Sequence, residues 1–231
     1  NVVLRKRQPG SSFKPIVYAA ALMKGFTPQT TIYDVITNFS ASGEAYIPKN
    51  FTNKEYGPVT LKKALAGSLN ITAVKVLYLT GIDTVSTLAK DLGYTSLNDP
   101  QRYGLTLVLG GGEVTLLEHA SAYTAFAREG ERAEPIAILK IEDRHGKVLQ
   151  EFKDPKVNRV FDEEIARQMN DMLSDNNARS YIFGANNLLT LSGRPVAAKT
   201  GTTNDVRDAW TIGYTPSVVT GVWVGNNDNT S

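Results

Sequence analysis

A serine and a lysine near the start of the chain have a spacing that could support nucleophilic catalysis. Ser11 and Lys14 lie three positions apart, and on a helix such residues face the same way, with Cβ atoms roughly 5–6 Å apart. A helix is predicted from Ser11 towards Gly25, because apolar residues follow at helical spacing: Phe13, Ile16, Val17, Ala20, Ala21 and Leu22. A neutral amine beside a serine hydroxyl can accept its proton, and the N–H groups at a helix N-terminus stabilise negative charge. Ser11 is therefore a candidate nucleophile and Lys14 its candidate base.

Ser68 and Asn70 form a second pair of polar groups. Thr60 opens a predicted helix whose leucines recur at helical spacing, and the pair lies in or just after its last turn. A hydroxyl and a carboxamide two positions apart are suited to relaying a proton and holding a substrate amide. Taken alone, such a pair is equally typical of a helix-end cap.

A third group lies on a predicted strand over residues 195–203. Lys199, Thr200 and Thr202 offer donors to an anion, and a carboxylate suits such a set. Gly201 puts no side chain on this strand, which we interpret as room for a substrate lying against the strand edge. The alternative interpretation is an ordinary solvated β-turn.

The elements that must position these residues are predicted to be helices first and strands last. Beyond the two helices above, helical periodicity covers residues 72–80, 84–92, 114–127 and 163–173. β-Prone runs predict a hairpin over residues 137–152 and a meander of antiparallel strands over residues 195–203, 208–214 and 218–225. We therefore expect an α+β domain with a helical lobe over about 12–130, a hairpin and helix over about 131–175, and sheet strands over about 195–226.

Two stretches lack a regular pattern. Residues 26–60 are rich in Thr, Asn, Pro, Gly and Tyr without periodicity, and long connections of this kind are often functional. Residues 110–112 are three glycines, but they lack the Gly-Lys-Ser/Thr ending of a phosphate loop. We interpret them as a tight turn into the next helix.

The composition excludes several classes of protein. With 231 residues, of which 42% are hydrophobic, the chain can bury a proper core and is not disordered. A net charge of +2 gives no support for nucleic-acid binding. No apolar run approaches the roughly 20 residues of a membrane-spanning helix. The absence of cysteine excludes disulfides and thiolate chemistry, and we expect neither a metal nor another cofactor.

Histidine offers no convincing alternative base. The chain contains only His119, in a predicted helix, and His145, in the predicted hairpin turn, and we expect structural roles for both. With no Gly-x-Ser-x-Gly elbow, a Ser-His-Asp triad is not supported. Serine chemistry in this chain must therefore use lysine.

The three groups occur in the order Ser-x-x-Lys, Ser-x-Asn, Lys-Thr-Gly, which is the signature of β-lactamases and penicillin-binding proteins. Four longer stretches extend the likeness: residues 7–15, 64–70, 109–115 and 199–226. Over nearly its whole length the chain resembles the transpeptidase domain of class A, bifunctional penicillin-binding proteins. The resemblance implies their α+β fold, which they share with serine β-lactamases, with an antiparallel sheet packed against helices and a mainly helical lobe.

The same resemblance implies acyl transfer on peptidoglycan stem peptides ending in D-Ala-D-Ala. Ser11 would attack the penultimate D-Ala carbonyl and form an acyl-enzyme. Lys14 would accept the serine proton, with its pKa lowered by Lys199 and by partial burial. Ser68 would pass a proton to the leaving amine, alone or with Lys199, and Asn70 would hold the substrate amide. An amine of a second stem peptide would then take the acyl group and form the cross-link.

Binding of the substrate's end is also implied by the resemblance. Lys199, Thr200 and Thr202, with Gly201 between them, would bind the terminal carboxylate. The backbone N–H groups of Ser11 and Thr202 would form the oxyanion hole. β-Lactam antibiotics resemble the D-Ala-D-Ala end, so they would acylate Ser11 and remain attached.

The family's layout extends beyond this chain at both ends. It has a β-hairpin before the nucleophile helix and a helix after the last strand, so we expect a truncated domain with an incomplete sheet. The missing strands would belong to another fragment or would have been trimmed away, which leaves the activity of the chain itself open. The resemblance also implies a parent protein with an upstream glycosyltransferase domain and a membrane anchor, at the extracytoplasmic face of the bacterial cell membrane. This chain itself is expected to be soluble.

Three other functions use similar residues and stay open. A class A serine β-lactamase needs a glutamate-held water, and no Glu-x-x-Leu-Asn stretch lies between Asn70 and Lys199. A D,D-carboxypeptidase would use the same site with water as the acceptor. A β-lactam-sensing domain would be acylated once, without turnover.

Overall fold

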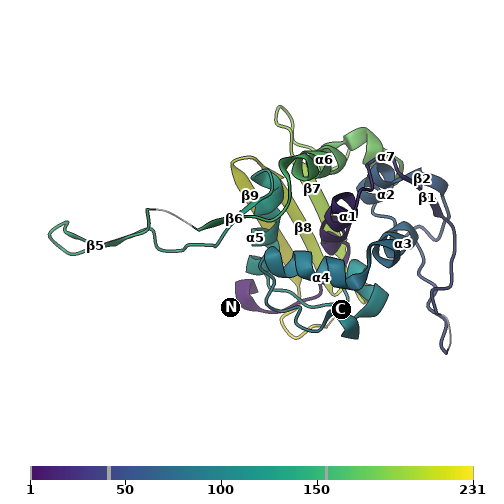
Figure 1. Ribbon diagram of the computed structural model, residues 1–231, viewed down its shortest axis with the longest axis horizontal. Helices are drawn as coiled ribbons and strands as arrows, with labels where there is room; N and C mark the ends of the chain where they lie inside the picture. The colour runs from purple at the N-terminus through teal and green to yellow at the C-terminus, as the bar shows by residue number, and fades with distance from the viewer. Residues whose placement is uncertain (1, 41–42, 154–155, 231) are drawn as a thin grey trace.

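A three-stranded antiparallel sheet lies on one side of the molecule, and helices pack against it (Figure 1). The protein is described by a computed structural model, which covers residues 2–40, 43–153 and 156–230. The most central helix, α1 (Lys14–Met23), packs against helices α2, α3, α4 and α6. A 3₁₀ turn, η2 (Gly10–Phe13), leads directly into α1 and contacts the first strand of the sheet. The candidate nucleophile therefore lies where a buried helix begins, beside a strand.

The predicted helices are confirmed, and the described part of the chain contains one further α-helix. The α-helices after α1 are α2 (Leu61–Ala66), α3 (Asn70–Thr80), α4 (Ile82–Asp91), α5 (Leu116–Ala127), α6 (Glu163–Ser174) and α7 (Asn176–Phe183). Short 3₁₀ turns are η1 (Val2–Leu4), η3 (Pro100–Arg102), η4 (Gly104–Leu109) and η5 (Asn204–Val206). The unpredicted helix is α7, although Asp175 caps its first turn by accepting from the Ala178 N–H at 2.9 Å.

No single helix in the described part of the chain is long and apolar enough to cross a membrane. Only when taken together are helices α3 and α4 long and apolar enough for this, and the chain bends by 91° between them.

The predicted meander is confirmed as the main sheet. Strands β7 (Ala197–Thr202), β8 (Asp208–Thr215) and β9 (Val218–Gly225) pair antiparallel in the order β7-β8-β9. In this register Lys199 is opposite Ile212, and Gly201 is opposite Trp210. Helix α5 packs against β8 and β9.

Three further pairs of antiparallel strands occur in the described residues. They are β1 (Thr31–Asp34) with β2 (Gly57–Thr60), β3 (Glu131–Ala133) with β6 (Val157–Arg159), and β4 (Lys140–Glu142) with β5 (Val148–Glu151). The last pair is the predicted hairpin, and it extends away from the body of the molecule (Figure 1). The first two were not predicted, because their strands are short and pair across long stretches of chain, so that no turn signal marks them as a hairpin. We call residues 134–153 the arm.

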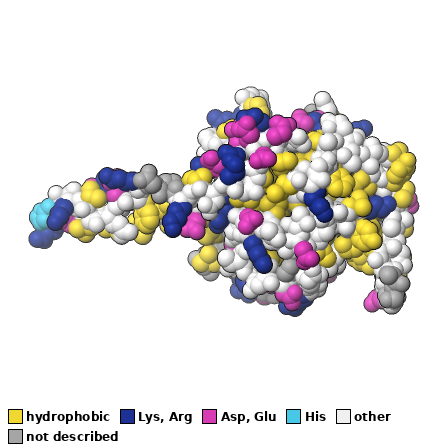
Figure 2. All heavy atoms as spheres, in the orientation of Figure 1, with side chains coloured by type: hydrophobic (Ala, Val, Ile, Leu, Met, Phe, Trp, Pro, Cys, Tyr) yellow, Lys and Arg dark blue, Asp and Glu magenta, His cyan; other side chains and the backbone are white. Residues whose placement is uncertain are grey.

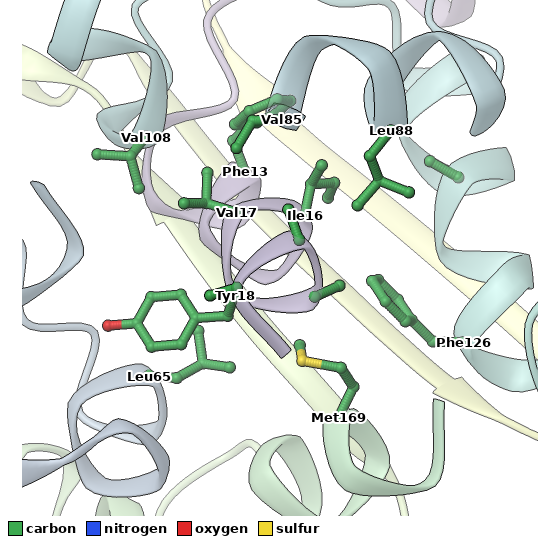
Figure 3. Packing of buried hydrophobic residues seen from close by; sticks show 14 of the residues in the cluster. Phe13, Ile16, Val17, Tyr18, Leu65, Val85, Leu88, Val108, Phe126 and Met169 are labelled. Carbon is green, nitrogen blue, oxygen red and sulfur yellow. The ribbon is translucent and has the colours of Figure 1, made fainter. Parts of the chain in front are cut away.

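One hydrophobic cluster joins the helices to the sheet (Figure 3). Its buried side chains come from α1 itself, from η2 and η4, and from helices α2, α4, α5 and α6: Phe13, Ile16, Val17, Tyr18, Leu65, Val85, Leu88, Val108, Phe126 and Met169. Burial of each large apolar side chain is worth about 1.5–3 kcal/mol. Because α1 contributes residues from all its sides, its position relative to β7 is fixed by this cluster.

Candidate active site

A cleft of about 540 Å³ lies where η2, the α2–α3 junction and β7 meet. Five of the predicted site residues line it: Ser11, Ser68, Asn70, Thr200 and Thr202. The other lining residues come from neighbouring segments: Gln8, Tyr46, Phe51, Gly67, Thr106, Leu109, Gly111, Ile182, Phe183 and Thr203. The structure thus brings together three groups that lie far apart in the sequence.

Strand β7 approaches the η2 turn so closely that two positions require glycine. Gly10 has φ +56°, and a Cβ added there would lie 2.5 Å from the carbonyl oxygen of Thr202. A Cβ added at Gly201 would lie 2.8 Å from Ser12 Oγ and would overlap the carbonyl oxygen of Pro9. The interpretation of Gly201 as room for a substrate is therefore corrected, since this buried space is filled by the η2 turn itself.

A buried histidine holds the η2 turn from behind. The Ser12 hydroxyl donates to the Pro9 carbonyl at 2.6 Å and lies 2.8 Å from His119 Nε2, while His119 Nδ1 lies 2.6 Å from the Tyr94 hydroxyl. Because the Ser12 hydrogen is directed at Pro9, His119 donates from Nε2 and accepts the Tyr94 hydrogen at Nδ1. Burial lowers the pKa of His119 to about 3, so the ring stays neutral. His119 thus anchors the turn and does not line the cleft.

The α2–α3 junction presents Ser68 in a strained conformation. Helix α2 ends at the Gly67 cap and Asn70 begins α3, so two residues make the turn between them. Ser68 has φ +58°, a left-handed value that costs a residue with a Cβ about 1–3 kcal/mol. Such strain persists only where surrounding contacts hold it. Here Lys14 contacts the carbonyl oxygen of Ser68, and Asn50 contacts the N–H of Asn70.

Lys14 is fully buried and directed at this junction. Its Nζ donates to Ser68 O at 2.7 Å, Asn70 Oδ1 at 2.7 Å and Leu69 O at 3.2 Å, and lies 3.4 Å from Ser68 Oγ. Within the described residues no hydrogen bond joins Lys14 Nζ to the Ser11 hydroxyl, the contact that helical spacing alone predicts. The carbonyl and carboxamide oxygens of the α2–α3 junction hold the amine instead.

Electrostatics favour a neutral amine at Lys14. Burial lowers its pKa well below the usual value, and the charge of Lys199 lowers it further. The carboxylate of Asp34 acts in the opposite direction. A neutral amine can donate its two hydrogens to the two oxygens at 2.7 Å, which leaves its lone pair for a hydroxyl proton.

Lys199 approaches Ser68 from the sheet side. Its Nζ donates to Ser68 Oγ at 2.8 Å and to Thr200 O at 2.9 Å, so the Ser68 hydroxyl lies between two lysine amines. Burial lowers the pKa of Lys199 to about 7, and the charge of Arg179 adds to this effect. Lys199 can therefore carry or lose its proton near neutral pH.

Several cleft and supporting residues were not identified from the sequence. Tyr46 and Phe51 belong to the long irregular segment, which was expected to be functional without naming residues. Asn50 and Asp34, in the same part of the chain, are buried and bonded to one another at 2.6 Å. Ile182 and Phe183 from α7 line the far wall. The cap at Asp175 and the following Gly184 are the signals that could have revealed α7.

No cluster of three or more His, Cys, Asp or Glu residues suited to a metal ion occurs in the described residues.

A family model described as "Penicillin binding protein transpeptidase domain" matches residues 2–230. Penicillin-binding protein 1A of Aquifex aeolicus is 41% identical over 227 residues, which cover 95% of this chain and 29% of that protein. The chain therefore spans less than a third of the length of this relative.

Solved structures show the same relationship. The crystal structure of penicillin-binding protein 1A from Haemophilus influenzae superposes with a TM-score of 0.86 at 28% identity, over 99% of this chain and 39% of that one. PonA1 of Mycobacterium tuberculosis, solved in complex with penicillin V, has a TM-score of 0.86 at 26% identity, over 100% of this chain and 63% of that one.

Proposed function

The chain belongs to the penicillin-binding protein transpeptidase domain family, and we propose that it transfers the acyl group of a D-Ala-D-Ala stem peptide to an amine through Ser11. The observation that carries this proposal is the Ser68 hydroxyl, 2.8 Å from one lysine amine and 3.4 Å from the other, in the cleft that Ser11 lines. The complex of the similar PonA1 with penicillin V supports β-lactam binding by this chain.

In the first half-reaction Ser11 attacks the penultimate D-Ala carbonyl. The Ser11 proton moves to Lys14, whose burial and nearby positive charge favour the neutral amine that can accept it. The Oγ–C bond forms as the carbonyl oxygen becomes negative. Backbone N–H groups of Ser11 and Thr202 stabilise this oxyanion, an effect worth about 2.7–4 kcal/mol for one donor in another hydrolase.

Collapse of this intermediate breaks the C–N bond to the last D-Ala. The leaving nitrogen takes a proton through the Ser68 hydroxyl, which lies between Lys14 and Lys199 and can pass a proton from either amine. Free D-Ala departs with that proton, and the acyl group stays on Ser11. Asn70, whose amide also donates to Lys49 O at 2.8 Å, contacts the substrate backbone from the cleft wall.

The terminal carboxylate binds at the strand side of the cleft. Thr200 and Thr202 line this wall with hydroxyl donors, and Lys199 lies behind them with a pKa of about 7. In the second half-reaction the amine of another stem peptide attacks the acyl carbonyl. It loses a proton to the same lysine pair, Ser11 is released as a hydroxyl, and the new amide is the cross-link.

The first test is acylation. The purified chain is incubated with benzylpenicillin at neutral pH, and intact-mass spectrometry with peptide mapping follows the product. We expect a mass increase equal to one penicillin on Ser11, and none for Ser11→Ala, whose melting temperature should match that of the unmodified protein. A folded protein that gains no mass would refute the proposal.

The same samples separate the alternative functions. An adduct that persists for hours fits a transpeptidase or a sensor, whereas a rapid return to the original mass indicates a β-lactamase. Polymerised lipid II with a labelled D-amino acid then distinguishes the rest. Incorporation of the label indicates transpeptidation, loss of D-Ala alone indicates a carboxypeptidase, and no turnover indicates a sensor.

A further inference from the structure

Two buried polar residues, Asn50 and Asp34, contact the first turn of α3 next to the Ser68–Asn70 junction. Asn50 is 4% exposed and lies within the irregular segment over residues 26–60, while Asp34 is fully buried at the end of strand β1. Neither belongs to the three motifs in the sequence. Their contacts nevertheless lead directly to the residues proposed to handle the proton and the substrate amide.

Asn50 acts as a cap for α3 from outside that helix. Its Oδ1 accepts from the N–H of Asn70 at 2.8 Å and from the N–H of Ile71 at 3.3 Å, the first two amides of α3. The residue in the usual cap position, Leu69, has no side-chain acceptor. Because Ser68 is held at φ +58°, the junction depends on contacts of this kind to keep its shape.

Asp34 fixes the other end of the Asn50 carboxamide. Its Oδ2 accepts from Asn50 Nδ2 at 2.6 Å and from the Tyr56 N–H at 3.0 Å, and its Oδ1 accepts from Thr72 Oγ1 at 2.9 Å. Asn50 Nδ2 also donates to Lys54 O at 2.9 Å. With both amide hydrogens engaged, the Asn50 oxygen has only one orientation, which faces α3.

We propose that Asn50 and Asp34 are positioning residues for acyl transfer. Asn50 holds the Ser68–Asn70 junction against Lys14, and Asp34 orients Asn50 and is connected to the Lys14 amine through the hydrogen bonds of Asn50 and Asn70. This inference rests on the proposed function, since it concerns the rate at which Ser11 is acylated. Neither residue needs to touch the substrate.

The charge of Asp34 acts on several neighbouring groups. It raises the pKa of Lys14, against the larger lowering effects of burial and Lys199, and it also raises the pKa of Lys75 on α3. On α1 and α7 it contributes to the raised pKa values of Tyr18 and Tyr181. Among these groups, only Lys14 is proposed to accept the Ser11 proton, so the acylation rate depends on the protonation state of Lys14.

The orientation role is tested with Asn50→Ala. The rate of Ser11 acylation by benzylpenicillin, measured from pH 5 to pH 9, should fall about 10- to 100-fold at its plateau, as expected for a displaced catalytic group. The pH at which the rate is half-maximal on the acid side should not move, because no charge has changed. Thr60→Ala removes the cap of α2, a comparable contact away from the junction, and should leave the rate within about twofold of the wild-type value.

The charge role is tested with Asp34→Asn. The new amide can donate to the Thr72 hydroxyl while its oxygen still accepts from Asn50 and Tyr56, so the contacts survive and only the charge is lost. Loss of a nearby negative charge disfavours the Lys14 ammonium and lowers its pKa. The acid side of the rate profile should therefore move to lower pH, with the plateau retained.

Asn50→Ala should lower the plateau rate without moving the pH profile, whereas Asp34→Asn should move the profile without lowering the plateau. A general loss of stability would produce neither result. A folded Asn50→Ala protein with the wild-type plateau overturns the orientation role. An Asp34→Asn profile that falls at every pH without moving overturns the charge role, and it remains informative if Asn50→Ala does not fold. Failure of the wild-type protein to be acylated would instead refute the proposed function.

Discussion

The arm and the segments that form the candidate active site, here called the wall (residues 8–14, 67–70 and 199–203), contain similar residue types. For the most part, these residues are closely packed in the wall and exposed to solvent on the arm. At the wall, η2 and β7 approach so closely that Gly10 and Gly201 have no room for a Cβ, and both Lys14 and Lys199 are buried. On the arm, lysine, glycine and leucine occur in exposed positions, and hydrophobic and charged side chains lie side by side on its surface (Figure 2). The same residue type therefore has different consequences in the two regions.

The arm is organised by contacts between near neighbours in the sequence. In its turn, Asp143 Oδ1 accepts from the N–H groups of His145 and Lys147 at 2.8 and 3.0 Å, and Gly146 has φ +80°. At the wall, by contrast, Lys14 bonds to residues 54–56 positions away, and Lys199 bonds to one 131 positions away. The residues proposed to react lie in the region where distant segments of the chain together exclude water.

The sharpest test of this contrast compares two lysines. Lys14→Gln should slow acylation of Ser11 about 10²- to 10⁴-fold, because a neutral carboxamide cannot accept the serine proton. Lys140→Gln, on the arm, removes an exposed ion pair with Glu142 and should leave the rate unchanged. Stopped-flow fluorescence or timed mass spectrometry gives both rates. Equal rates for the two variants would contradict the assignment of Lys14 as the base.

Two glycines provide the next comparison. Gly201→Ala forces β7 away from Pro9 and Ser12, so acylation should fall about 100-fold and stability by about 1–3 kcal/mol. The Cβ added by Gly146→Ala would have no atom within 4 Å. This substitution should lower stability only through the positive φ of the residue, so acylation should be unaffected. Chemical denaturation and acylation rates measure both effects. A well-folded, fully active Gly201→Ala protein would show that the close approach is dispensable.

The pH dependence of benzylpenicillin binding tests the role of Lys199. The pKa of Lys199 is about 7 because burial and Arg179 disfavour its charge, so the ammonium is present below pH 7 and is lost above it. Affinity for the benzylpenicillin carboxylate should therefore weaken as pH rises past 7, by up to about tenfold per pH unit. Lys199→Arg, which stays charged, should remove this decline. A wild-type affinity that is constant from pH 6 to pH 9 would argue against carboxylate binding by Lys199.

The smallest effect is expected from the arm's apolar residues. Leu65→Ala, at a fully buried position beside α1, should reduce the free energy of unfolding by about 2–5 kcal/mol. Leu149→Ala, at a position that is 61% exposed, should change it by less than about 0.5 kcal/mol. Urea unfolding measures both. A large loss for Leu149→Ala would mean that the arm contributes to the stability of the body.

Much of the fold follows from local patterns in the sequence. The helices that carry Lys14 and Asn70, the hairpin of the arm and the three-strand meander all have a periodicity or a turn signal within a few residues. The three motifs and the need for lysine in place of histidine also follow from residue types and order alone. The pairs β1–β2 and β3–β6 do not, since their short strands are defined by partners distant in the chain.

The sequence by itself thus determined which residues could perform the chemistry and which elements carry them. Only the tertiary structure decided that Lys14 bonds to the Ser68–Asn70 junction and not to the Ser11 hydroxyl, and that Gly201 makes room for Pro9 and not for a ligand. It also decided that Asn50 caps the start of α3. The reason is physical: periodicity records which face of an element is apolar, whereas a hydrogen bond or a steric limit between distant segments exists only once packing has brought their atoms together.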